Sequence, residues 1–294
     1  MPDDFSLDPA HVRRQFNRAA VTYDDTDVLA RATAEQMLAR LEGIVHTPTH
    51  ILDLGCGTGR DLAALSSRYP DARLSAIDSA GALVERIAPS GGVLSRLFKR
   101  APRIDRIVAD ARALPLPPAR VDMVWSNLML NWLTDPAPAL REMHRVMKVG
   151  GMLMFATLGP DTLKELRAAL GAHGDAHVHP FIDMHDIGDA LVGAGFGDPV
   201  MDMDVLTLTY RQFDDLIRDL RQSGSTNAAS HRPRNLGQRQ RWDAARAAYE
   251  HHRQEGRLPA TFEIVYGHAW KPEPRTLDDG RAVIRFQPRP GAPR

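Results

Sequence analysis

The chain has one cysteine, Cys56, and no long uninterrupted apolar run. A single cysteine excludes disulfides within the chain and favours a reducing compartment, so we expect a cytoplasmic protein. No apolar stretch approaches the roughly 18 residues that a membrane-spanning helix needs. The acidic, proline-containing start from Met1 to Asp8 is unlike a secretory signal. We therefore expect no membrane association.

An excess of either charge is also lacking, because 37 basic residues balance 37 acidic ones. A neutral chain has no general attraction for nucleic acid or for an anionic membrane surface. With 294 residues, it is long enough for one large α/β domain and an attached subdomain.

The usual phosphate-binding patterns, G-x-G-x-x-G and G-K-S/T, are absent from the main glycine-rich stretch. That stretch, Ile51 to Gly59, reads Ile-Leu-Asp-Leu-Gly-Cys-Gly-Thr-Gly. An apolar run precedes the glycines, and Arg60 to Tyr69 has apolar residues at helical spacing, so we predict strand, tight loop and helix. Glycines at alternate positions let a ligand approach the main chain closely.

Three carboxylates follow the predicted strands in a regular way. Asp53 stands just before the first glycine, where it would repel a pyrophosphate and suits a cation or an amine. Asp78 ends a second short strand, the position that holds ribose hydroxyls in doubly wound sheets. Asp110 ends a third strand, where it is expected to accept a hydrogen bond from an adenine amine. Together they predict a pocket for a cationic nucleoside.

The pattern D-x-G-x-G-x-G with these acids resembles the class I S-adenosylmethionine-dependent methyltransferases. The resemblance implies S-adenosylmethionine as cofactor and an N-terminal segment over the cofactor mouth, in which Tyr23 either contacts the cofactor or packs against the sheet. Cys56 is interpreted as a small residue that fits the loop. The cofactor-binding residues predicted on this basis are Tyr23, Asp53, Gly55, Cys56, Gly57, Gly59, Asp78, Ser79, Asp110, Ala111 and Asn127.

Apolar runs that alternate with helical stretches predict an α/β fold: a seven-stranded, mostly parallel, doubly wound Rossmann-like sheet. The predicted strands are residues 50–54, 73–78, 104–109, 121–126, 151–157, 200–210 and 262–270. Lys148 and the glycines at 150 and 151 are interpreted as a helix stop. Ser126 and Asn127 are expected in the ligand crevice at the end of the fourth strand, and Trp132 either shapes the acceptor pocket or belongs to the core.

The same sequence patterns predict the domain organisation. We predict N-terminal lid helices over 1–46, a core over 47–210 and 258–271, a helical cap over 211–257 and a flexible tail over 272–294. A basic, glycine-broken insertion at 89–102 is interpreted as a solvated loop rather than a docking patch. His177, His179 and His185 lack the spacing of a metal site, so we predict no metal.

The resemblance narrows to the biotin-synthesis methyltransferases that methylate the free carboxyl of malonyl-acyl carrier protein. It rests on F-x-x-A-A-x-x-Y near the N-terminus, Leu-Asp-Leu-Gly-Cys-Gly-Thr-Gly, Trp125-Ser-Asn-Leu, and Leu220-Arg-Gln-Ser-Gly-Ser-Thr. It implies malonyl-acyl carrier protein as partner. The chain is also similar to mitochondrial complex I assembly factors, which share Gly159-Pro-Asp-Thr-Leu-Lys-Glu-Leu and look like arginine hydroxylases or non-catalytic binders. Quinone-type small-molecule methyltransferases share the core as well.

The predicted cap contains ten arginines and six acidic residues, which indicates an anionic acceptor. A malonyl carboxylate, with a pKa near ~4, is ionised at neutral pH and needs no general base. Arg218 is therefore the predicted grip on that carboxylate, with Arg221 beside it facing the carrier protein. The alternative is that both are solvent-facing helix charges. The sequence does not distinguish an acyl carrier protein from coenzyme A.

Overall fold

A computed structural model describes residues 5–88, 104–171, 177–232 and 239–274. The predicted insertion at 89–102 and the tail beyond residue 274 lie outside these ranges. In the described part of the chain, no helix is both long enough and apolar enough to cross a lipid bilayer.

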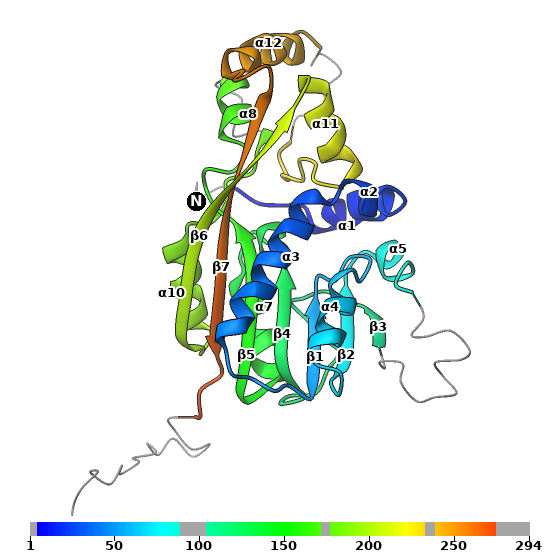
Figure 1. Ribbon diagram of the computed structural model, residues 1–294, viewed down its shortest axis with the longest axis vertical. Helices are drawn as coiled ribbons and strands as arrows, with labels where there is room; N and C mark the ends of the chain where they lie inside the picture. The colour runs from blue at the N-terminus through cyan, green and yellow to red at the C-terminus, as the bar shows by residue number, and fades with distance from the viewer. Residues whose placement is uncertain (1–4, 89–103, 172–176, 233–238, 275–294) are drawn as a thin grey trace, which may run out of the picture.

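The centre of the molecule is a seven-stranded sheet in the order β3-β2-β1-β4-β5-β7-β6 (Figure 1). Strands β1 to β5 are parallel to one another, and β7 runs antiparallel to both β5 and β6. The prediction of a mostly parallel sheet of seven strands is confirmed. The strands are β1 His50–Leu54, β2 Arg73–Asp78, β3 Ile104–Val108, β4 Val121–Asn127, β5 Met147–Leu158, β6 Gly197–Tyr210 and β7 Leu258–Trp270.

Helices cover both faces of this sheet, with α3 and α4 on one face and α7 and α10 on the other (Figure 1). The helices are α1 Pro9–Ala19, α2 Tyr23–Thr26, α3 Val28–Arg40, α4 Asp61–Arg68, α5 Gly81–Val84, α7 Ala137–Val146, α8 Lys164–Ala169, α10 Met184–Gly193, α11 Phe213–Gln222 and α12 Arg239–Tyr249. Short 3-10 turns add η1 Leu41–Gly43, η2 Leu130–Trp132 and η4 Glu250–His252.

Strand β1 shows why the central strands read as apolar runs. All of its residues are buried, because helices cover both faces of a parallel sheet. Successive side chains point to opposite faces, so Ile51 joins the core beneath α3 and α4 while Leu52 and Leu54 join the core beneath α7 and α10. Asp53 therefore points to the α3 side.

The predicted helix stop after α7 is wrong. The helix ends at Val146, and β5 begins at once with Met147, so both glycines lie inside the strand. Gly150 has a φ of +77°, and no atom lies within 4 Å of the position that a Cβ would take there. The pairing of β4 with β5 shifts register in the same part of the sheet. The glycines therefore allow a local irregularity in the strand.

Strands β6 and β7 are longer than predicted and extend past the rest of the sheet into a helical cap of α8, α11 and α12 (Figure 1). Helix α11 begins with a reciprocal capping box between Gln212 and Asp215 and buries Phe213 and Leu216. Those side chains belong to the same apolar cluster as α3 and α4, so the cap continues the core. The predicted division at residues 211 and 257 stays a prediction.

Candidate active site

The glycine loop lies at the carboxyl end of β1 and is held by β2. Gly55, Gly57 and Gly59 all have left-handed backbone conformations, with φ of +79°, +55° and +78°. The amide N–H groups of Gly55 and Cys56 donate to the carbonyl oxygen of Ile77 over 2.8 and 3.1 Å. Only glycine adopts such a run without strain, so the loop conformation explains the spacing.

Asp78 lies directly against this loop. Its Oδ2 accepts from the amide N–H of Gly57 over 3.0 Å, and its Oδ1 accepts from the amide N–H of Ala80 over 2.8 Å. Burial raises the pKa of Asp78 above the usual aspartate range, although these amide donors oppose the rise. Ser79 follows Asp78 in the sequence, directly after the end of β2. The structure thus joins the predicted ribose ligand to the predicted loop.

Asp53 is 2% exposed, and its Oδ2 has no hydrogen-bond partner among the described residues. Burial, with the neighbouring carboxylates of Asp61 and Asp78, raises the pKa of Asp53. A buried carboxylate oxygen without a donor is costly unless a ligand supplies one. This position therefore suits a cationic or hydrogen-bond-donating ligand.

Asp61 is a site residue that sequence reasoning missed. It opens α4, and its Oδ2 accepts from the indole N–H of Trp125 over 2.9 Å and from the amide nitrogen of Asn127 over 3.3 Å. Burial raises the pKa of Asp61. An acid in the first turn of the helix after the glycine loop was the available indication.

Asn127 connects the end of β4 to the lid helix α3. Its amide nitrogen donates to the carbonyl oxygen of Ala30 over 2.8 Å, and its Oδ1 accepts from the hydroxyl of Thr33 over 2.7 Å. Ser126 is fully buried and, by the alternation along a strand, points to the face of β4 opposite Asn127. Its expected place in the ligand crevice stays a prediction.

Asp110 lies at the end of the β3 segment, where the N–H of Ala109 donates to the carbonyl oxygen of Asp78 over 3.0 Å. Both Asp110 carboxylate oxygens accept from Arg112, which lowers the pKa of Asp110. Ala111 is buried beside it. The predicted contact of Asp110 with an adenine amine stays a prediction.

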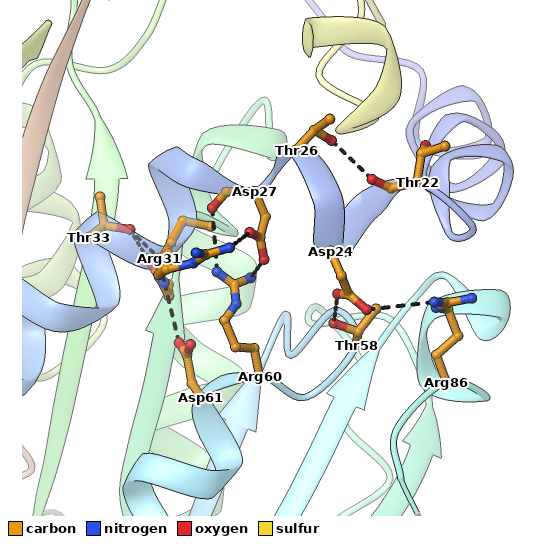
Figure 2. Close-up of polar contacts among 12 residues, drawn as sticks. Thr22, Asp24, Thr26, Asp27, Arg31, Thr33, Thr58, Arg60, Asp61 and Arg86 are labelled. Atoms are coloured by element: carbon orange, nitrogen blue, oxygen red, sulfur yellow. Dashed lines mark hydrogen bonds and ion pairs between the residues drawn. The ribbon is translucent and has the colours of Figure 1, made fainter. Parts of the chain in front are cut away.

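The N-terminal helices lie across the carboxyl end of the sheet, and polar contacts fasten them to the glycine loop (Figure 2). The hydroxyl of Thr58 donates to Asp24 over 2.5 Å. Asp27, which is 5% exposed, forms ion pairs with Arg60 over 2.5 Å and with Arg31 over 3.1 Å. These polar contacts therefore hold the lid helices against the glycine loop.

Tyr23 covers Gly57. A Cβ atom on Gly57 would lie 3.3 Å from Cε1 of the Tyr23 ring, which shows how closely the ring approaches the loop. Burial raises the pKa of Tyr23. Cys56, also buried, has a raised thiol pKa for the same reason. An un-ionised thiol agrees with the interpretation of Cys56 as a small packing residue.

A cavity of about 340 Å³ lies between the lid, the ends of β5, β6 and β7, and the cap. Tyr23 and Asp27 contribute from the lid, and Trp132, His179 and Leu220 are among the other lining residues. Trp132 lines the cavity and meets the Phe16 ring edge-on at 5.0 Å; its predicted role in an acceptor pocket stays a prediction. Apolar side chains make up most of the wall.

Arg218 and Arg221 do not line this cavity. Arg218 is 56% exposed on its side chain and forms an ion pair with Asp215, one turn earlier on α11. Arg221 is also exposed. The neighbouring residues Asp219 and Leu220 face the cavity instead. The helical period thus turns both arginines outward, and the grip on the acceptor carboxylate that we predicted for Arg218 stays untested.

His177 and His179 both line the cavity, and His185 does not. His185 is exposed next to Asp183, whereas the Nε2 atom of His179 accepts from the N–H of Ala228 over 2.9 Å. Burial lowers the pKa of His179 to about 4. Within the described ranges, no group of three or more His, Cys, Asp or Glu side chains is placed to hold a metal ion.

These residues fit S-adenosylmethionine. The glycine cradle under Tyr23, the unpartnered oxygen of Asp53 and the carboxylate of Asp78 face one small region at the end of β1 and β2. Carboxylates without bound cations suit a ligand with positive charge on sulfur and nitrogen.

Known proteins agree with this geometry. A family model described as a methyltransferase domain matches residues 52–155. Malonyl-acyl-carrier protein O-methyltransferases of Laribacter hongkongensis and of a Methylovorus strain are 49% and 46% identical, over 98% of this chain and 99% and 97% of theirs. The solved YcgJ protein of Bacillus subtilis shares the fold, with a TM-score of 0.54 at 15% identity over 82% of this chain and all of that one. The chain belongs to the malonyl-acyl-carrier protein O-methyltransferase family of S-adenosylmethionine-dependent methyltransferases.

Proposed function

We propose that this chain methylates the free carboxyl of a malonyl thioester carried on acyl carrier protein, as a step of biotin synthesis in the cytoplasm. The observation that carries the proposal is the mostly apolar cavity of about 340 Å³ next to the lid, whose Tyr23 lines the cavity and covers Gly57. It has room for a short acyl chain beside a cofactor bound at that loop. The names of the relatives supply the acceptor class.

The cofactor, when bound, supplies an electrophilic methyl group on a sulfonium. Asp78 is positioned for the ribose hydroxyls, and Asp53 and Asp61 provide negative charge near the ligand's positive groups. Tyr23 and the lid exclude water above Gly57. Exclusion of water strengthens the attraction between the anionic acceptor and the positive donor.

The acceptor carboxylate is ionised at neutral pH, so the protein has only to orient it. Uncharged polar side chains line the cavity, among them those of Asn131, Ser225 and Asn227. Neutral donors orient the carboxylate without strongly stabilising its charge, which is lost during the reaction. The methyl ester would mask the malonyl charge, so that fatty-acid elongation enzymes accept the chain.

Arg218 and Arg221 enter this proposal as surface residues. Their exposed positions on α11 suit contact with an acidic carrier protein better than contact with the carboxylate inside the cavity. On this account Arg218→Ala and Arg221→Ala raise KM for malonyl-acyl carrier protein several-fold. They leave KM unchanged for a malonyl thioester of N-acetylcysteamine, which has no carrier protein to dock.

The decisive experiment incubates the protein with radiolabelled methyl donor and malonyl-acyl carrier protein, with acetyl-acyl carrier protein as control. We expect label in the malonyl protein alone, released by mild base as methanol. A protein that binds the donor but labels neither acceptor would contradict the proposal. Malonyl-coenzyme A in a parallel reaction tests how far the carrier protein is needed.

A further inference from the structure

The wall of the cavity contains no lysine or arginine among the described residues. Two carboxylates do line it, Asp27 and Asp219. Asp27 is neutralised by its ion pairs with Arg60 and Arg31. Asp219 forms no ion pair with any described residue, so its charge is the uncompensated one.

Asp219 lines the cavity from α11, a cap helix that lies next to the lid helices (Figure 1). Tyr210, at the end of β6, lines the same cavity and interacts with this carboxylate. Burial and this carboxylate raise the pKa of Tyr210, so the hydroxyl stays protonated at neutral pH. Asp219 therefore brings a negative charge to the cap side of the cavity.

A negative charge in the wall of a cavity that receives an anion affects the orientation in which that anion enters. The acceptor carboxylate is attracted to the positive methyl donor and repelled from Asp219, so it enters with its charged end toward the glycine loop. A second negative charge at the other end of the acceptor would lie near Asp219 in a water-poor space, where like charges repel strongly.

We propose that Asp219 is a specificity-determining residue that rejects acceptors whose second end is also anionic. The acceptor class is then a carboxylate joined to an uncharged chain, as in a malonyl thioester, and not a dicarboxylate. This inference rests on the proposed carboxyl methylation and adds a requirement that the second end of the acceptor is uncharged.

The methyl transfer is consistent with this role of Asp219. A carboxylate oxygen forms a bond to the methyl carbon while the sulfur–carbon bond breaks and its electron pair stays on sulfur. One negative and one positive charge disappear together, and the ester product is neutral. The neutral ester is not repelled by Asp219, so the charge acts on the acceptor and not on the product.

The test compares two small acceptors, the malonyl thioesters of 3-mercaptopropionamide and of 3-mercaptopropionate. They differ mainly in one terminal charge. The wild-type protein is expected to prefer the amide-ended thioester by about tenfold or more in kcat/KM, the size of a like-charge repulsion at the cap end. Asp219→Asn, which keeps an acceptor for Tyr210, should reduce that preference to about threefold or less.

Asp214→Asn is the matched control, because Asp214 lies on the same helix, is 63% exposed and pairs with Arg246 away from the cavity. It should leave the preference unchanged. Tyr210→Phe removes the donor but keeps the charge, so discrimination should persist in that variant.

An Asp219→Asn protein that melts normally and discriminates as the wild type does would overturn the inference. So would a wild-type protein that uses both thioesters equally, whatever the variant does. If the wild type methylates neither thioester nor malonyl-acyl carrier protein, the proposed function itself has failed, which is a separate outcome.

Discussion

Asp78 contacts the glycine loop, and we predict that it also binds the ligand. Its carboxylate accepts from the N–H of Gly57. We expect Asp78→Ala to weaken binding of S-adenosylhomocysteine by roughly tenfold or more, because it loses a ligand contact and a loop contact together. Isothermal calorimetry measures the affinity. Asp78→Asn keeps one acceptor oxygen, so its affinity should lie between those of the wild type and Asp78→Ala. Unchanged affinity in Asp78→Ala would remove Asp78 from the site.

Gly57 tests the close approach of the lid. An alanine there would adopt an unfavourable φ of +55° and place its Cβ 3.3 Å from the Tyr23 ring. We expect a loss of about 1 kcal/mol in unfolding free energy together with weaker cofactor binding. Gly150→Ala is the matched control, since Gly150 also has a left-handed φ, +77°, but open space around it. It should lose stability without losing affinity.

At the scale of elements, the polar contacts that hold the lid differ in strength. Asp27 is buried between Arg60 and Arg31, so Asp27→Asn leaves a partly buried guanidinium without its counter-charge. We expect a loss of roughly 3 kcal/mol and faster hydrogen exchange across α2 and α3. Exchange measured by mass spectrometry locates the change.

Asp24→Asn provides the comparison, because Asp24 is half-exposed where it meets Arg86 over 3.7 Å, and an asparagine there still accepts from the hydroxyl of Thr58. Exposed pairs contribute less than about 1 kcal/mol, so this variant should exchange almost as the wild type does. Equal exchange in both variants would mean that apolar packing alone holds the lid.

The sequence allowed the strand, loop and helix around Gly55 to be predicted because each feature there is local. Apolar runs, alternate glycines and acids at strand ends lie within a few residues of one another. The place of Asp78 at the end of the second strand was predicted from the topology of a doubly wound sheet. The fold class follows from such short-range patterns.

The directions of side chains in space were harder to predict. The helical period of α11 turns Asp219 and Leu220 toward the cavity and Arg218 outward, which charge and resemblance did not indicate. Asp61 was missed because its partners Trp125 and Asn127 lie far away in the sequence.

At the scale of the whole molecule, buried imidazoles make stability depend on pH. Burial lowers the pKa of His50, His144, His179 and His268. An unfolded histidine has a pKa near about 6.5, so below that pH the unfolded chain binds protons that these folded side chains resist. Their stabilising contribution is complete above pH 6.5 and decreases as the pH falls.

His179 is the strongest case, with a pKa of about 4 in the folded protein. From pH 7 to pH 5 we expect it alone to cost about 2 kcal/mol of unfolding free energy. His179→Gln keeps an acceptor for the N–H of Ala228 but does not titrate, so its stability should fall less over this range. Urea unfolding at both pH values measures the difference. His185→Gln, at an exposed site, should follow the wild type, and an equally steep fall in His179→Gln would contradict the assignment.

Strands β6 and β7 continue without a break from the base of the sheet into the cavity wall, where Leu208, Tyr210 and Phe262 contribute side chains. Alternation along a strand means that sliding one partner by a single residue would exchange inward and outward side chains along the whole β6–β7 pair. If the cavity binds the acceptor as proposed, we expect changes in acceptor preference to arise by replacing individual wall residues, since an insertion or deletion of one residue in either strand would reverse which side chains face the cavity.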